Sequence, residues 1–96
     1  MAKAYWVVCY REIKDPAKLA EYAKLAGPAV QAHGGRFLGR GVAAKAHELG
    51  KLERTVIIEF DSLERAVAAH DSPAYGEALQ VLEGFADRDF RILEGV

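Results

Sequence analysis

The segment from Arg54 to Tyr75 constrains the fold more than any other part of the sequence. Residues 55–60 alternate Thr, Ile and Glu with Val, Ile and Phe, which predicts a buried strand with apolar residues on both faces. Asp61 or Ser62 can cap a helix directly afterwards, and the Ser72-Pro pair predicts the start of another helix. A strand followed so closely by two capped helices predicts an α+β fold.

The rest of the chain supplies the other strands and the first helix. We expect strands at residues 3–13, 36–42, 55–60 and 89–94, a first helix from Asp15-Pro16 to about Gly34, and a connecting arm at residues 43–53. Gly39 and Gly41 favour a bulge in the second strand.

This order is the split βαββαβ arrangement. Right-handed crossovers then place the helices on one face of a four-stranded antiparallel sheet. At this length we expect residues 1–96 to form one domain.

The sheet face opposite the helices has no cover in this arrangement. Since the first and third strands carry apolar residues on both faces, a single copy would expose a large apolar patch. A second copy covers it most economically, burying on the order of 1,600 Å² between the two sheet faces. The sequence therefore predicts a homodimer through the open sheet face, in which the two sheets form an α/β barrel.

Composition excludes several classes of partner. The net charge of −1 and the pI near 6.3 argue against nucleic acid. The N-terminal stretch lacks the apolar length of a signal peptide or membrane span, so we expect a cytoplasmic protein.

We expect the lone Cys9 to be a small buried hydrophobe. No complete glycine-rich cofactor motif is present, and the histidines at 33, 47 and 70 lack a metal-ligand spacing, so we expect neither a cofactor nor a metal.

Six segments together resemble a known family. They are Ala4-Tyr-Trp-Val, Asp15-Pro with Tyr22, His33-Gly-Gly-Arg-Phe-Leu-Gly-Arg-Gly41, Arg54-Thr-Val-Ile-Ile-Glu-Phe60, Ser72-Pro-Ala-Tyr75 and Ile92-Leu-Glu-Gly95. Over nearly its whole length the chain resembles domain of unknown function 1330, a family in the dimeric α/β-barrel superfamily. The resemblance implies a ferredoxin-like protomer and a barrel-forming dimer but no established reaction. The chain departs from the family pattern at Ala69-His70, where an aromatic pair is typical, and at Asp61, where proline is usual.

Charged residues on the second and third strands are the first candidates for chemistry. Arg54 and Glu59 lie an odd number of positions apart, so their side chains leave opposite faces of the strand. Glu59 is a candidate general base, with an ion pair to Arg36, Arg40 or Arg91 as the favoured alternative. Arg36 and Arg40 are expected to share a strand face, where they either clamp a substrate carboxylate or remain solvated or paired across the dimer.

A second candidate group follows the third strand. His70, Ser72 and Tyr75 combine an imidazole, a hydroxyl and a phenol that can bind or deprotonate a small polar ligand. Packing is the favoured alternative, because Ser72 is also a helix cap and Tyr75 a core aromatic. Trp6 and Tyr10 share a strand face and either floor a pocket or fill the core.

Two functions remain open from the sequence. One is a protein that binds a small organic molecule between sheet and helices, including the case of a cofactor-free oxygenase- or isomerase-like enzyme suggested by analogy with the superfamily. The alternative is a noncatalytic dimeric accessory or stress-related module. Only the first requires a pocket.

Overall fold

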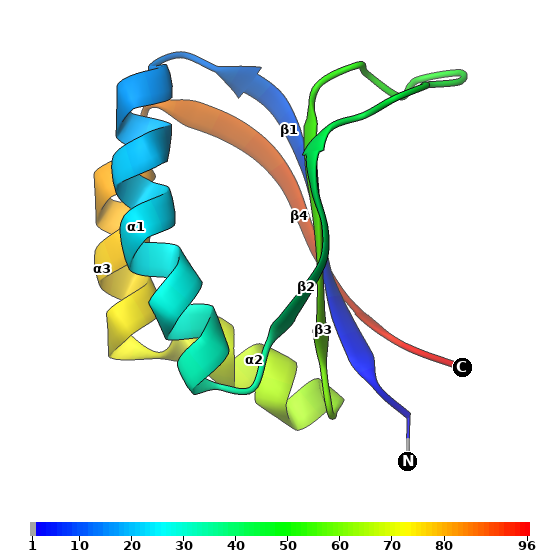
Figure 1. The fold of residues 1–96 in the computed structure, drawn as a ribbon, viewed down its shortest axis with the longest axis vertical. Coiled ribbons are helices and arrows are strands. Elements are labelled where there is room, and N and C mark those ends of the chain that lie inside the picture. The colour runs from blue at the N-terminus through cyan, green and yellow to red at the C-terminus, as the bar shows by residue number, and fades with distance from the viewer. Residues whose placement is uncertain (1) are drawn as a thin grey trace.

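A four-stranded antiparallel sheet carries three helices on one face (Figure 1). The computed structural model describes residues 2–96, with the elements β1 (Ala4–Ile13), α1 (Pro16–Ala32), β2 (Arg36–Val42), β3 (Arg54–Phe60), α2 (Leu63–Asp71), α3 (Pro73–Leu82) and β4 (Ala86–Glu94). The strands lie in the order β2-β3-β1-β4. This topology confirms the predicted split βαββαβ fold.

The helices begin where the sequence provides caps. The carboxylate of Asp15 accepts a hydrogen bond from the backbone N–H of Ala17 at 3.0 Å, and the hydroxyl of Ser62 accepts one from Arg65 at 3.2 Å. Ser72 follows the last residue of α2 and also caps α3. It caps α3 because its hydroxyl accepts a hydrogen bond from the backbone N–H of Tyr75. Each cap satisfies an N–H group that the first helical turn leaves without a partner.

The core lies between the sheet and the helix layer. Every second residue of β1, from Ala4 through Trp6 and Val8 to Tyr10, is buried on the helix side. Trp6 is fixed in this layer because its indole N–H donates to the carbonyl of Ala66 on α2 at 2.9 Å. Small residues on the buried helix faces bring the helices close to these aromatic side chains; they are Ala26, Ala29, Ala66, Ala69 and Ala78.

The opposite face of the sheet carries no helix (Figure 1). Val7 of β1 is registered against Ile57 of β3 there, and Leu93 of β4 is 59% exposed. Cys9 lies on this face as well and is exposed, so the prediction of a buried cysteine is wrong for the single chain. The reason is its odd position in a strand whose even positions face the core. The arm between β2 and β3 projects away from the helices.

Two details of the strands differ from expectation or refine it. The predicted bulge in β2 is present, as the pairing with β3 shifts between Phe37 and Gly39. β4 begins at Ala86, three residues earlier than predicted, which brings Arg88 into the sheet opposite Tyr10. Both details decide which arginines reach the space under the helices.

None of the helices in residues 2–96 has the length and apolarity needed to cross a membrane.

Candidate functional site

A cavity opens between the sheet and α1. Its walls come from β1, β2, β3, β4, α1 and α3. The space inside it that the centre of a water molecule can occupy has a volume of about 40 Å³. By that measure it has room for about three water molecules or one small polar group. The lining residues are Trp6, Val8, Tyr10, Tyr22, Ala23, Ala26, Gly27, Val30, Phe37, Arg40, Arg54, Val56, Ile58, Tyr75 and Arg88.

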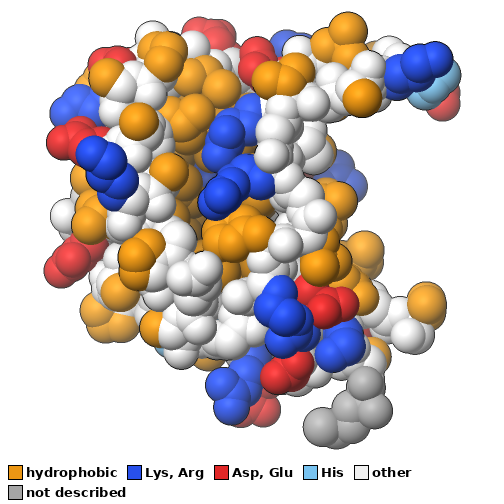
Figure 2. Space-filling view, in the orientation of Figure 1, with side chains coloured by type: hydrophobic (Ala, Val, Ile, Leu, Met, Phe, Trp, Pro, Cys, Tyr) orange, Lys and Arg blue, Asp and Glu red, His pale blue; other side chains and the backbone are white. Residues whose placement is uncertain are grey.

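Three arginines, each from a different strand, reach this apolar cavity. They are Arg40 on β2, Arg54 on β3 and Arg88 on β4. Figure 2 shows basic side chains in the hollow between the helix layer and the sheet, surrounded by hydrophobic ones. The guanidinium carbons of Arg54 and Arg88 lie 5.9 and 5.6 Å from the ring centre of Tyr10. Both distances are within the range of a cation–π interaction, so the Tyr10 ring stabilises two positive charges of the cavity.

A chain of hydrogen bonds connects one of these arginines to two phenols. Arg88 donates to the hydroxyl of Tyr22 at 3.1 Å, and that hydroxyl shares a second hydrogen bond of 2.5 Å with the hydroxyl of Tyr75. Burial raises the pKa of Tyr22, and Tyr75 adds to the effect while Arg88 opposes it. Burial also opposes the charge on Arg88, but the surrounding tyrosines outweigh it and raise the pKa, so Arg88 stays protonated. The cavity thus holds a fixed cation beside neutral phenols.

Five of the residues singled out in the sequence line the cavity; they are Trp6, Tyr10, Arg40, Arg54 and Tyr75. His70 and Ser72 do not. The His70 ring lies 5.5 Å from the Tyr75 ring and packs edge-on against Phe90, while its Nδ1 lies 3.3 Å from a carboxylate oxygen of the adjacent Asp71.

The hydroxyl of Ser72 is fully engaged in the local backbone. It accepts from Tyr75 N–H and donates to the carbonyl of Ala69 at 2.8 Å. The predicted cluster of His70, Ser72 and Tyr75 is therefore close in space but does not direct its polar atoms into one pocket. In this respect the packing alternative fits the geometry better.

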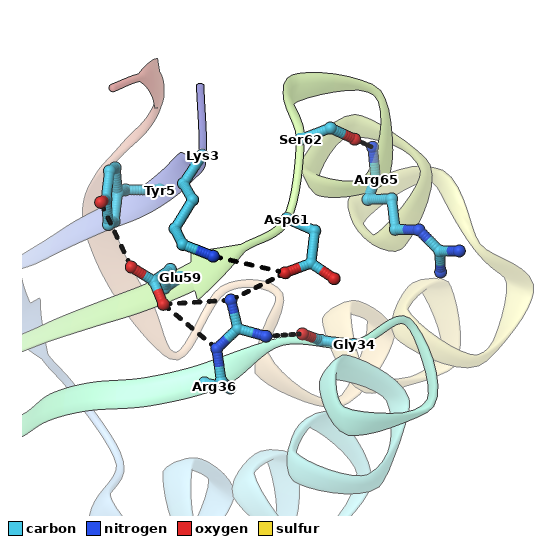
Figure 3. A network of polar contacts seen from close by, with 8 residues as sticks. All are labelled: Lys3, Tyr5, Gly34, Arg36, Glu59, Asp61, Ser62 and Arg65. Atoms are coloured by element: carbon cyan, nitrogen blue, oxygen red, sulfur yellow. Dashed lines mark hydrogen bonds and ion pairs between the residues drawn. The ribbon is translucent and has the colours of Figure 1, made fainter. Parts of the chain in front are cut away.

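Arg36 and Glu59 belong to a separate polar network on the open face (Figure 3). Arg36 Nη2 lies 3.0 Å from a carboxylate oxygen of Glu59 and 3.0 Å from one of Asp61. The Tyr5 hydroxyl donates to the carboxylate of Glu59 at 3.2 Å. Lys3 Nζ lies 3.6 Å from a carboxylate oxygen of Asp61. The Arg36 guanidinium lowers the pKa of Asp61. The favoured alternative for Glu59, an ion pair with Arg36, is what the structure shows.

The expectation that Arg36 and Arg40 share a strand face is wrong. Arg36 is registered against Glu59 on the open face, whereas Arg40 is registered against the buried Val56. The bulge at residues 37–39 adds one residue to β2, and one extra residue reverses the alternation of the side chains beyond it. Arg40 consequently joins Arg54 under the helices.

The sequence reasoning missed Arg88 and Tyr22 as site residues. In the sequence Tyr22 stands out only as part of the family resemblance. Arg88 fell outside the predicted last strand, because the charged residues at 87–89 do not resemble a strand. The alternation of side chains along a strand could have indicated Arg88. It lies two residues before Phe90 and four before Ile92, both of which face the core, so it faces the core as well.

Metal-binding side chains are not grouped in the described part of the chain. No three His, Cys, Asp or Glu residues within residues 2–96 lie together as a metal site requires. The donor set of the cavity is instead cationic and phenolic, which suits an anion or a hydrogen-bond acceptor.

The fold and cavity define a ferredoxin-like α+β protein with a small cationic pocket between its sheet and helices. Residues 3–96 match the family model described as domain of unknown function DUF1330, and the chain belongs to that family. A comparison with curated proteins finds no match.

Several solved structures share the fold at low sequence identity. A protein of unknown function from Rhodopseudomonas palustris, RPA0582, is 18% identical with a TM-score of 0.74, covering 99% of this chain and 83% of that one. SnoaB, a cofactor-independent oxygenase from Streptomyces nogalater, is 12% identical with a TM-score of 0.63, covering 97% and 92%. A dimeric ferredoxin-like protein of unknown function from Thermobifida fusca is 13% identical with a TM-score of 0.57, covering 97% and 91%.

Proposed function

We propose that this protein is a homodimer in which each protomer binds a small organic molecule in the cavity between sheet and helices. One observation carries the proposal: the cavity combines apolar walls with a few convergent polar groups, which is the usual composition of a small-molecule site. Trp6, Val56 and Ile58 supply apolar surface, while the arginines and phenols supply hydrogen-bonding groups that can orient a ligand. A noncatalytic module acting through its surface has no need of such a lining.

The proposed dimer forms through the open sheet face. Val7 and Ile57 make an apolar centre on that face, and the Arg36–Glu59 and Arg91–Asp89 ion pairs flank it. An apolar centre with a charged rim is the usual anatomy of a protein interface. Structural neighbours described as dimeric add support.

The proposal concerns binding, and turnover is a separate measurement. The protomer fold is shared with a cofactor-independent oxygenase, but fold does not determine function. Incubation of an identified ligand with the protein in air, followed by mass analysis of the ligand, tests for oxygen insertion or isomerisation.

The single tryptophan of the chain makes binding directly measurable. Trp6 lines the cavity, so a ligand that enters it changes the tryptophan fluorescence. Native mass spectrometry of the purified protein first reports subunit count and any retained ligand. A panel of small aromatic and aliphatic compounds is then titrated against Trp6 fluorescence.

A pair of variants on α1 separates cavity binding from surface binding. Ala23 lines the cavity, so the larger side chain of Ala23→Leu should fill part of it and weaken binding at least about tenfold. Ala20 is exposed and outside the cavity lining, so Ala20→Leu should leave the affinity unchanged. If no compound is retained and none alters Trp6 fluorescence, the noncatalytic alternative replaces this proposal.

A further inference from the structure

Three positively charged side chains converge on the cavity without a counter-charge from the described part of the chain. Arg40, Arg54 and Arg88 all line it, and none lies within ion-pair distance of an acidic group among residues 2–96. Among the residues that the structure describes, no Asp or Glu lines the cavity either. Several other basic residues of the same structure, by contrast, pair with carboxylates; they are Lys3, Arg11, Lys14, Lys18, Arg36 and Arg91.

An unpartnered donor accompanies this unbalanced charge. The Nε of Arg54 is buried and has no hydrogen-bond partner within the described residues. A buried donor without an acceptor costs about 1–3 kcal/mol, so such an atom calls for a missing acceptor. Arg54 and Arg88 both lie near Tyr10, with their guanidinium carbons within about 6 Å of the centre of its ring.

The shape and surroundings of the cavity narrow the chemistry of that acceptor. A free space of about 40 Å³ admits a head group of a few atoms and leaves the remainder of a ligand toward the mouth. The planar fork of arginine matches the two oxygens of a carboxylate. Aromatic and aliphatic walls, rather than a loop of backbone N–H groups, surround the charges, which disfavours inorganic phosphate.

We propose that the ligand of this cavity is an organic carboxylate with an apolar or aromatic body, held at its head group by Arg54, Arg88 and Arg40. This inference rests on the proposed function, because it names the class of molecule that the cavity binds. The pair of phenols contributes as well: when Tyr22 donates to Tyr75, the Tyr75 O–H is free to donate to a carboxylate oxygen.

The test compares acids with their neutral amides. Acetate, benzoate and phenylacetate, their amides, and inorganic phosphate are titrated against the full-length protein by Trp6 fluorescence and calorimetry. An aromatic acid is expected to bind at least about tenfold more tightly than its amide, and added salt should weaken the acid alone.

Arginine variants locate the preference. Arg54→Gln and Arg88→Gln should each lower the affinity for the acid at least about tenfold and abolish its preference over the amide. Arg54→Lys keeps the charge but loses the planar fork, and should restore only part of the affinity. Arg65→Gln is the matched control, since Arg65 is exposed on α2 and does not line the cavity.

A second readout distinguishes a ligand-binding arginine from a structural one. If Arg54 is held in the cavity for a ligand, its removal relieves an unpaired buried donor, and the Tm of ligand-free Arg54→Met should stay the same or rise. A fall in the Tm of several degrees would assign Arg54 a structural role and overturn the inference.

The remaining outcomes separate the two proposals. Equal binding of acids and amides overturns the carboxylate inference and leaves the cavity proposal intact. Tighter binding of phosphate than of any carboxylate also overturns it. Absence of binding by every compound, neutral ones included, overturns the proposed function together with this inference.

Discussion

Tyr22 on α1 and Tyr75 on α3 are separated by 53 positions in the chain, yet their hydroxyl oxygens lie 2.5 Å apart beneath the helices. The contact joins two helices through polar groups in an otherwise apolar layer. Arg88 donates to the same Tyr22 oxygen from the sheet, so three elements meet at one atom. The arrangement links the stability of the helix layer to the geometry of the cavity.

Removing either hydroxyl should destabilise the fold. Tyr22→Phe or Tyr75→Phe leaves the other phenol without its partner, and each should lower the free energy of unfolding by about 1–2 kcal/mol in urea titrations. The double variant should lose less than the sum of the two, because both groups of one hydrogen bond disappear together. Tyr5→Phe is the comparison on the open face, where the lost hydrogen bond goes to the partly buried Glu59, and it should cost less than either buried substitution. Strictly additive losses would show that the two hydroxyls do not interact.

Alkaline pH should reveal the environment of Tyr22. Its pKa in the folded protein is raised by burial, whereas an unfolded tyrosine titrates near pH 10. The neutral phenol is therefore favoured by folding, so its contribution to stability is complete below about pH 10 and is lost as the pH rises through the folded pKa. Part of the tyrosine absorbance change should appear only as the protein unfolds. Burial also raises the pKa of Tyr10, so Tyr22→Phe should reduce the delayed part by the absorbance of one tyrosine, and an undiminished delayed part would contradict the assignment.

The element order was predictable because its signals are local. Caps such as Asp15-Pro16 and Ser72-Pro73, and the alternation in residues 55–60, act within a few positions and fixed the split βαββαβ order. The side of the sheet that an arginine faces depends on register instead. Gly39 correctly indicated a bulge, but the side-chain reversal that follows from it separates Arg36 from Arg40.

The site was less predictable than the fold because its residues meet across long separations. Trp6, Arg40, Arg54 and Tyr75 were candidates for unrelated reasons, and nothing in the sequence indicated that they line one cavity. Arg88 was missed because neighbouring charges concealed the start of β4. The cytoplasmic location and the dimer stay predictions.

Two glycines with opposite surroundings provide a test of the packing. A Cβ added at Gly35 would lie 2.9 Å from the Phe60 ring and still closer to Val30, so Gly35→Ala should lower the free energy of unfolding by about 1–3 kcal/mol. A Cβ at Gly76, inside α3, meets nothing within 4 Å, so Gly76→Ala should raise it by up to about 1 kcal/mol through helix propensity. Urea titration of both variants measures the contrast. Equal effects of the two substitutions would mean that the Gly35 site is not tightly packed.

The open sheet face is the last element to test. A charge at the centre of an apolar interface remains unpaired on association, so Ile57→Lys should convert the proposed dimer to a monomer in sedimentation experiments at micromolar concentration. Val67→Lys is the matched control, because Val67 on α2 is 41% exposed and Ile57 37% exposed, but Val67 belongs to the helix layer. Cys9 gives an independent readout, since it lies on the same face as Ile57 and is exposed in the single chain. Alkylation of Cys9 should be slow in the native protein and fast in Ile57→Lys. Rapid alkylation of the native protein, or a native monomer, would contradict pairing through this face.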